Sequence, residues 1–228
     1  MLRQRIGFFI VVPLLLLGCS STQTMRVGVP PRVDLRQYPA VGLVTFSSSG
    51  ADAELERLST QRFLQAVQEA QPGTHVVELG PETQVLASVH GRSWDAATLR
   101  AIKEAHGVDA NVLGRLDVQK ARPNVEFSSS SIFKALDVRA DVKASLTARM
   151  VETASAATTW TDSSQLTTNV ASANMNNRGR GTFGVRDPQD AYAGMVDHLV
   201  CDITDAFRVH YVTRTVPRDQ LQTASAGD

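Results

Sequence analysis

The stretch LDVRADVKASLTARM, residues 136–150, decides the fold of this chain. Apolar and polar residues alternate along its whole length, which is the period of a β-strand with one buried and one wetted face. The apolar positions are Leu136, Val138, Ala140, Val142, Ala144, Leu146, Ala148 and Met150. Residues 153–156 predict a turn, and residues 157–163 predict a returning strand in which Trp160 anchors the core. The sequence therefore predicts a long antiparallel hairpin.

The residues before this hairpin predict alternating strands and helices. Short apolar runs at 40–46, 74–79 and 110–117 predict three further strands. Between them, we expect three helices, which begin near Asp52, Pro81 and Asp95 and end near Gln71, Gly91 and Gly107.

The residues after the hairpin predict a loop and a closing helix. Residues 164–186 are polar and rich in Asn and Gly, and they predict a loop. A helix is expected from Pro188, with an apolar stripe that contains Tyr192, Met195, Val196, Leu199, Val200, Ile203, Ala206 and Phe207. Cys201 falls on the opposite, polar side, so we expect an accessible or partner-covered thiol. The order β-α-β-α-α-β-β-β-α predicts a single domain of the α/β (α+β) class over residues 40–212, followed by a disordered tail at 213–228.

The N-terminus carries an export signal. Arg3 and Arg5 precede an apolar run at 6–17 that is too short to cross a bilayer comfortably. The run ends in Leu-Leu-Gly-Cys at 16–19, which resembles the bacterial lipobox. The alternative is a transmembrane anchor or a plain signal peptide with an incidental cysteine.

The lipobox resemblance implies how the chain is processed. Residues 1–18 would be a lipoprotein signal peptide, cut between Gly18 and Cys19. Cys19 would carry a diacylglyceryl group, and its new amino group a fatty acid such as palmitate. Ser20 is not acidic, which in such lipoproteins goes with the outer membrane and a domain that faces the periplasm. Residues 19–39 have several prolines and no helical period, so we expect the lipidated N-terminus to continue as a flexible tether.

Charge and cysteine content limit the function classes. The chain has 23 basic and 23 acidic residues, and loss of Arg3 and Arg5 with the signal peptide leaves a formal charge of −2. Such a balance does not attract nucleic acid or an anionic membrane surface. Once Cys19 is lipidated, Cys201 is the only thiol, so an internal disulfide is excluded. Export also removes ATP and nicotinamide cofactors from easy reach.

The element order on an exported lipoprotein resembles the TolB N-terminal-like fold. The residues that carry the resemblance lie at 41–46, at 107–114 (GVDANVLG), in the hairpin and at the start of the last helix. By pattern, the chain is similar to the curli-export (CsgG-type) lipoproteins, with the LpoB-type activators of penicillin-binding proteins as relatives. The family's Thr-Gly-Glu hairpin turn is replaced by TASAA at 153–157.

In the curli-export family, two inserted hairpins join those of neighbouring subunits in a membrane channel. The corresponding insertions are 119–135 and 164–187. A spanning strand needs about 9–11 residues with an unbroken apolar row. The first insertion is short and has Ser129 and Ser131 in its apolar row. The apolar row of the second insertion ends in polar residues. On sequence alone, these insertions favour a domain that stays out of the membrane.

Motifs for catalysis or metal binding are weak. Residues 179–184 match G-x-G-x-x-G but lack the preceding strand and following helix of a dinucleotide site, so we expect a loop. Residues 91–95 (GRSWD) predict a helix cap rather than a nucleophile elbow. The histidines, which show no metal-ligand spacing, are His75, His90, His106, His198 and His210. The acidic residues of the hairpin face, expected to pair with Arg139 and Lys143, are Asp137, Asp141 and Asp162.

The sequence thus predicts no enzyme, cofactor, metal or catalytic residue. The first hypothesis is a non-catalytic envelope lipoprotein, a periplasmic accessory module that binds an unknown envelope protein and supports assembly or export. The alternative is a homo-oligomeric, CsgG-like outer-membrane secretion channel.

Overall fold

The computed structural model describes residues 22–50, 53–130, 133–175, 181–185 and 188–217. These residues form two compact units. The larger unit spans Pro30–Val209, and the smaller one contains the two paired terminal strands. The predicted mixed α+β class is confirmed, since helices cover a mixed sheet in the larger unit.

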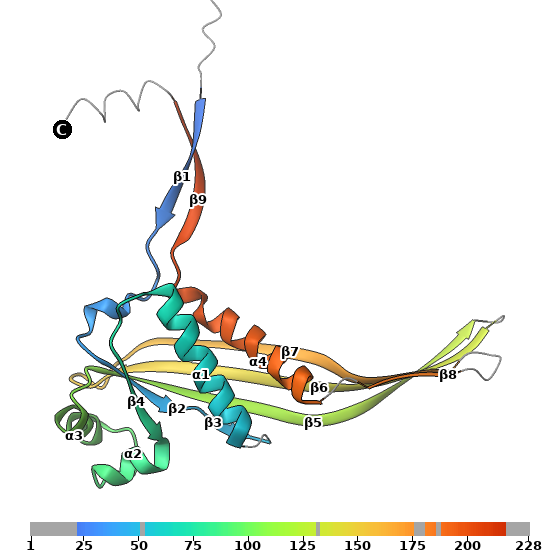
Figure 1. Cartoon of the computed structure of the whole chain (residues 1–228), viewed down its shortest axis with the longest axis horizontal. Helices are drawn as coiled ribbons and strands as arrows, with labels where there is room; N and C mark the ends of the chain where they lie inside the picture. Colours follow the sequence, from blue (N-terminus) through green and yellow to red (C-terminus); the bar gives the residue numbers. More distant parts are fainter. Residues whose placement is uncertain (1–21, 51–52, 131–132, 176–180, 186–187, 218–228) are drawn as a thin grey trace, which may run out of the picture. The chain divides into compact units, whose positions relative to one another are not determined.

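The larger unit is built on a seven-stranded sheet (Figure 1). Its strands are β2 Val41–Thr45, β3 Ser47–Ser49, β4 Val76–Pro81, β5 Ala110–Ser130, β6 Phe133–Glu152, β7 Thr158–Met175 and β8 Gly181–Val185. The order is β4-β2-β5-β6-β7-β8, and β3 also pairs with β5. The pairs β2–β4, β2–β5 and β3–β5 are parallel, whereas β5, β6, β7 and β8 pair antiparallel. The sheet thus changes from parallel to antiparallel at β5.

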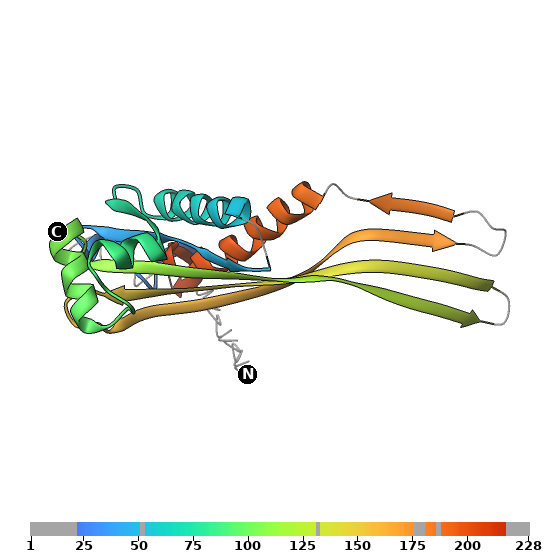
Figure 2. The same cartoon turned by 90° about the horizontal axis from the view of Figure 1, so that it is seen from below.

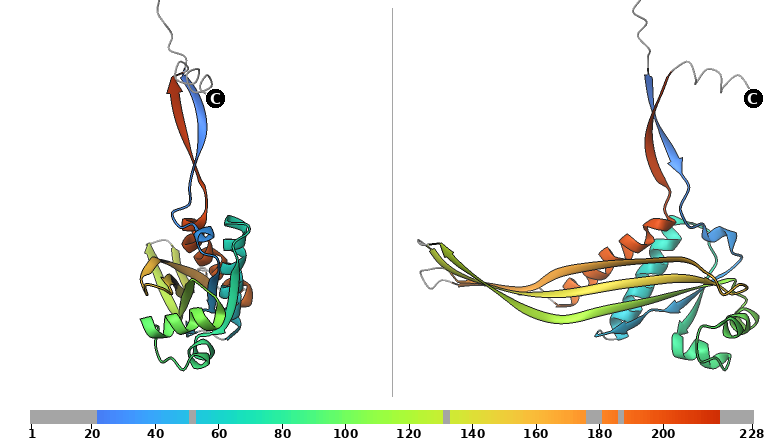
Figure 3. Two further views of the ribbon diagram at one scale, coloured as in Figure 1. Left: turned by 90° about the vertical axis from the view of Figure 1, so that its left-hand side faces the viewer. Right: turned by 180° about the vertical axis from the view of Figure 1, so that it is seen from behind.

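Helices cover the sheet of the larger unit. They are α1 Ala53–Ala70, α2 Glu82–Ser88, α3 Ala96–His106 and α4 Pro188–Thr204, with short 3₁₀ helices η1 Leu35–Gln37 and η2 Asp205–Phe207. Helices α1 and α4 lie side by side (Figure 3). Leu99 of α3 belongs to a separate buried cluster with Val44 of β2 and Leu113 of β5.

The larger core lies between the α1–α4 pair and the sheet. The rings of Phe46 and Phe63 are 5.2 Å apart, and that of Phe63 lies 6.0 Å from that of Phe207. Trp160 packs 4.8 Å from Phe207 and is only 8% exposed, which confirms its prediction as a core anchor. Gly114 is required here, because a Cβ at this position would collide with the ring of Phe46.

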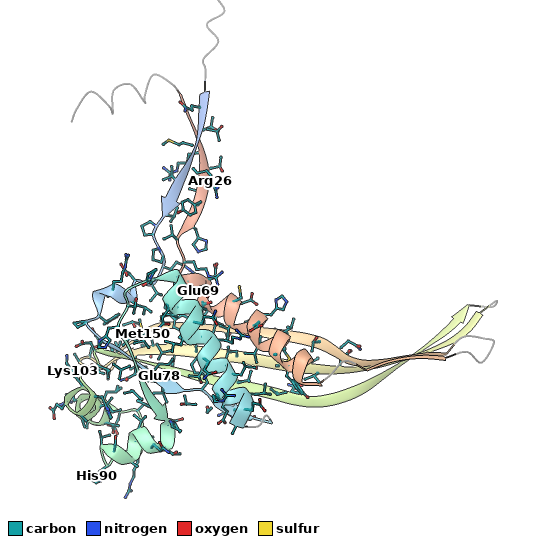
Figure 4. The ribbon with its side chains drawn as sticks, in the orientation of Figure 1. Arg26, Glu69, Glu78, His90, Lys103 and Met150 are labelled. Atoms are coloured by element: carbon teal, nitrogen blue, oxygen red, sulfur yellow. The ribbon has the colours of Figure 1, made fainter. Side chains whose placement is uncertain are left out.

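The alternation that predicts the long strand is confirmed where its side chains are described. Val142, Ala144, Leu146, Ala148 and Met150 are buried in the core shared with α1 and α4. The polar positions between them are exposed or half-buried. Figure 4 shows Met150 within the folded unit. The predicted stripe of the last helix is confirmed in the same way, since its buried residues are Met195, Val196, Leu199, Val200 and Ile203.

Helix α3 begins and ends where the sequence predicts. The Asp95 carboxylate accepts hydrogen bonds from the backbone N–H groups of Ala97 and Thr98, at 3.1 and 2.9 Å. The Thr98 N–H is the main reason that the pKa of Asp95 is lowered, because it favours the charged carboxylate. Gly107 ends the helix with φ of 68°, a left-handed conformation that suits glycine.

The prediction that residues 19–39 lack regular structure is wrong for the part that the structure describes. Leu35 is 1% exposed and belongs to the core of the larger unit. The side chain of Gln71 fixes this segment: it accepts a hydrogen bond from the Leu35 N–H at 2.7 Å and donates to the carbonyl oxygens of Val33 and Phe207 at 2.6 and 3.0 Å. Hydrogen bonding and burial therefore order residues that local sequence marks as a tether.

The smaller unit corrects both predicted ends of the domain. Strand β1, Thr22–Val29, pairs antiparallel with β9, His210–Pro217, and this is a two-stranded sheet. Residues 22–29 were expected in the tether and residues 213–217 in the tail. Residues 1–21 and 218–228 lie outside the described part of the chain.

Strands β5 and β7 are longer than their sequence patterns predict, and β8 is a further strand that no pattern predicts. Strand β5 continues from the predicted end at 117 to Ser130, and β7 continues from 163 to Met175. Strand β8 occupies Gly181–Val185, within the predicted loop at 164–186, and it overlaps the G-x-G-x-x-G match at 181–184. The predicted loop is therefore wrong for most of its residues.

Candidate functional site

The predicted lipidation site lies outside the described residues. Gly18 and Cys19 precede Thr22, where the structural description begins. Cleavage and lipid attachment therefore stay predictions. Within the described residues, the candidate site is an extended part of the sheet.

We use β-extension for residues 119–130 of β5, 133–143 of β6, 166–175 of β7, and β8. Figures 1 and 2 show these strands continuing past the ends of α1 and α4. The strands pair antiparallel from Gln119 opposite Lys143 to Ser130 opposite Phe133, with register shifts between Gln119 and Arg122 and between Ala140 and Asp141. The β-extension is thus a four-stranded antiparallel sheet, irregular near its base, that begins where the helical layer ends.

The register groups apolar positions into rows on one face of the β-extension. Each row runs across the strands from β5 to β8, and adjacent rows are two residues apart, which places them on the same face. The rows contain Phe127, Leu136, Met175 and Gly181; Val125, Val138, Ala173 and Phe183; and Pro123, Ala140, Ala171 and Val185. On β6, this face continues directly into the buried positions Val142 and Ala144.

The intervening rows contain polar residues and a glycine. They are Glu126, Asp137, Asn174 and Thr182, and then Asn124, Arg139, Ser172 and Gly184. Asp137 and Arg139, two residues of opposite charge, stand two positions apart on β6. Between Pro123 and Phe127 of β5, apolar and polar rows therefore alternate across all four strands.

Buried packing and hydrogen bonds hold the base of the β-extension. Val142 is fully buried beside the core residues of α4. Asn169 of β7 donates a hydrogen bond to the Asp141 carboxylate of β6 at 3.0 Å. Ser164 of β7 donates to the Asp202 carboxylate at 2.7 Å. Strands β6 and β7 thus leave the core as a fixed pair.

A polar groove of about 360 Å³ lies at this base. It is lined by Asp117, Gln119, Lys143, Ala144, Ser145, Gln165, Leu166 and Thr167. Most of these side chains are polar, and they come from the three central antiparallel strands. The groove adjoins the polar rows of the β-extension, so the polar face is continuous from the folded unit outward.

A second groove, of about 220 Å³, lies between α2 and the central strands. Arg115 and Arg149 line it, and Trp94 donates a hydrogen bond from Nε1 to the Glu82 carboxylate at its edge, at 2.6 Å. Arg115 is already paired with Asp117 at 3.1 Å. This arrangement has the surface charge to meet a polar partner but no nucleophile or base in a catalytic arrangement.

The other residues singled out from sequence do not come together. Asp162 forms an ion pair with Arg32 at 3.9 Å, instead of the predicted pairing with hairpin cations, whereas the side chain of Asp137 lies outside the described set. Among the described residues, no group of three or more His, Cys, Asp and Glu side chains could hold a metal. The five histidines are exposed or half-buried, and Ser88 lies 3.3 Å from the ring nitrogen Nε2 of His106.

Cys201 is exposed, as its position on the polar side of the last helix predicts. The thiol is therefore available as a probe site rather than a part of the core. The helices within the described residues include none with the length and apolar character to cross a membrane.

Sequence reasoning missed the length of the β-extension. The signal that could have found it is the periodicity on β7, where Ala171, Ala173 and Met175 keep the period of two beyond the predicted end. Residues 136–140 belong to the predicted strand at 136–150, and a strand of that length needs neighbouring strands of similar length to pair its backbone N–H and C=O groups.

Comparisons with known proteins find similar folds but no family. No protein-family model and no curated protein matches the chain. Among solved structures, a PelC dodecamer from Paraburkholderia phytofirmans is similar at 7% identity, over 82% of this chain and 98% of that chain, with a TM-score of 0.42.

Two bacterial lipoproteins are also similar. Lipoprotein GNA1162 from Neisseria meningitidis has 14% identity over 73% of this chain and 98% of that chain, with a TM-score of 0.34. The LpoB C-terminal domain from Salmonella enterica has 10% identity over 57% of this chain and 83% of that chain, with a TM-score of 0.32. All three TM-scores lie below 0.5, so these similarities assign neither a family nor a function, and the resemblance to curli-export proteins stays a prediction.

Proposed function

We propose that this chain is a non-catalytic, lipid-anchored protein of the bacterial envelope that supports export as a subunit of an oligomeric outer-membrane channel. The observation that carries the proposal is the amphipathic β-extension. Residues 119–130 of β5 and 133–143 of β6 have the length of a membrane-spanning strand, for which about 9–11 residues are needed.

The two faces of the β-extension suit two different surroundings. On β6, the apolar positions beyond the buried Val142 run from Leu136 to Ala140, and at about 3.3 Å per residue they cover roughly 13 Å of the apolar band of about 25 Å that spans a membrane. The polar rows and the groove at the base suit a water-filled passage. A single chain supplies only four strands, so several copies are needed to enclose a passage.

The accessory module remains the second candidate. Polar residues enter the apolar face at two points, because Ser129 lies opposite Lys134 and Thr168 lies opposite Val142. This interruption favours a β-extension that packs on a partner protein of the envelope rather than on lipid. Cys19 lipidation and attachment to the outer membrane are common to both candidates.

The two candidates differ in what a charge on the apolar face does in the membrane. An acylated Cys19 would hold every variant in the membrane, so we would express the chain as Cys19→Ala behind a cleavable signal peptide in a Gram-negative host and measure how much resists extraction from outer membranes by urea at high pH. Val138→Arg places a cation on the apolar face, where an arginine at the bilayer midplane costs about 2–4 kcal/mol. Asp137→Arg places the same cation on the polar face and is the matched control.

For a channel subunit, Val138→Arg is extracted while Asp137→Arg and the parent Cys19→Ala chain stay in the membrane. The cytoplasmically expressed Val138→Arg chain should keep its far-UV circular dichroism, since residue 138 lies outside the helix-covered core. Equal extraction of the two variants would argue against membrane insertion and favour the accessory module.

A further inference from the structure

The smaller unit is a two-stranded ribbon whose outer strand edges are both unpaired within the described residues. Its register sets Met25 opposite Arg214, Val27 opposite Val212, and Val29 opposite His210. A sheet of two strands is marginally stable by itself in water. The ribbon therefore gains most from a surface that covers one of its faces.

One face of the ribbon is apolar and open. Met25, Val29 and Val212 are 39%, 38% and 39% exposed, although all three belong to the same face as the half-buried Val27. On the opposite face, the register sets Thr24 opposite Thr215, and the guanidinium of Arg26 lies 5.2 Å from the ring centre of Tyr211. The face that contains Met25, Val27, Val29 and Val212 is thus the more apolar one, and it also contains Arg214, whereas the opposite face contains Tyr211, which is 63% exposed.

The charged side chains of the ribbon are all cationic. Thr22–Val29 and His210–Pro217 contain Arg26 and Arg214 but no aspartate or glutamate. Figure 4 shows Arg26 on the ribbon. Arg214 lies on the same face as Met25, and an arginine beside apolar side chains can reach toward phosphate groups while its methylenes stay on apolar surface. Arg26 lies on the opposite face, beside the ring of Tyr211. This combination fits an anionic phospholipid surface better than a protein core.

The chain brings this ribbon close to the predicted lipid. Only Ser20 and Ser21 separate Cys19 from Thr22, and a fully extended chain covers at most about 3.6 Å per residue. The first residue of the ribbon therefore lies within about 11 Å of an acylated Cys19. This step rests on the proposed lipid anchoring, whereas the apolar face and the charge do not.

We propose that the apolar face of the β1–β9 ribbon binds the interfacial layer of a membrane that contains anionic phospholipid. Arg214 would contact lipid phosphates, and the ribbon would act as a second membrane signal beside the acylated cysteine. The final strand would thereby hold the C-terminal end of the chain at the same surface as the N-terminal anchor.

The test uses the chain from residue 19 to 228 without lipid, as Cys19→Ala with Cys201→Ser, so that one introduced cysteine carries an NBD fluorophore. Met25→Cys places the probe on the apolar face, and Thr24→Cys is the matched control on the polar face. Vesicles of phosphatidylcholine, alone or mixed with phosphatidylglycerol, are added, and some carry nitroxide-labelled acyl chains.

With mixed vesicles, the probe at residue 25 should shift to the blue and be quenched by nitroxide, while the probe at residue 24 should not. Replacing Arg214 by glutamine should weaken binding to the mixed vesicles about 5-fold, and the same change at Arg26, on the opposite face, should have a smaller effect. Because the probe reports only its own surroundings, the β-extension cannot produce this contrast between adjacent residues.

Equal responses at residues 24 and 25, or none at either, would overturn the proposal. A blue shift at residue 25 that needs no vesicles and grows with protein concentration would also overturn it, because a second copy would then cover the face. Since the tested chain carries no lipid, these outcomes are separate from whether Cys19 is acylated in cells.

Discussion

The predicted membrane anchor of the chain depends on Cys19, because its thiol is the only group in the lipobox that accepts the diacylglyceryl group. Cys19→Ala should therefore leave an uncleaved or soluble chain in cells. The measurement is metabolic labelling with an alkyne fatty acid, with Cys201→Ala as the matched control that keeps the label. Labelling of the Cys19→Ala chain would contradict the lipid anchor.

Trp160 is the side chain that the hairpin's second strand packs into the core. It is 8% exposed and packs on Phe207, so truncation removes a large buried ring. Trp160→Ala should lower the free energy of unfolding by about 3–5 kcal/mol, measured by urea denaturation of the unlipidated chain. Thr161→Ala, at the exposed neighbouring position, is the control. A loss below about 1 kcal/mol would mean that the ring contributes little to the core.

Single residues of this kind could be predicted from sequence because local pattern decides them. Trp160 follows from the alternation of its strand, Cys201 from its angle on an amphipathic helix, and Asp95 from the cap position before a helical pattern. Gln71 could not be predicted in its role. Its three hydrogen bonds join segments far apart in the sequence, so no local pattern shows them.

Helix α3 gives a prediction about pH. Its cap lowers the pKa of Asp95, so the cap stabilises the fold above the ordinary carboxyl pKa and is lost as the pH falls through the lowered pKa. Asp95→Ala should reduce the urea midpoint at about pH 7, and the difference from wild type should shrink below about pH 3. Asp95→Asn keeps a capping oxygen and is the control. An unchanged difference at both pH values would contradict a charge-dependent cap.

At the scale of elements, sequence predicts the existence of strands better than their length. The run at 136–150 shows a clear period and is observed as β6, Phe133–Glu152. Residues 119–124 (QKARPN) show none and include Pro123, yet they continue β5 because β6 offers them a partner. Pairing rather than propensity sets the end of such a strand. The Ser- and Asn-rich part of β7 follows the same rule.

For the whole molecule, the α+β class and the order of the helices follow from sequence, but the terminal ribbon does not. Thr22 and Pro217 are paired although almost the entire chain separates them, and neither segment has a distinctive period. Pairing between segments so far apart in the sequence depends on the fold of the rest of the chain, and the local sequence of either segment does not show it. The amphipathic register of the β-extension is likewise a property of four strands together.

The channel proposal makes its sharpest claim about assembly, because four strands cannot enclose a passage alone. The decisive measurement is the native mass of the full, lipidated chain after mild detergent extraction from outer membranes. The account predicts one large, closed species of many copies, which Val138→Arg abolishes and Asp137→Arg preserves. A monomer or dimer for the wild-type chain would contradict it.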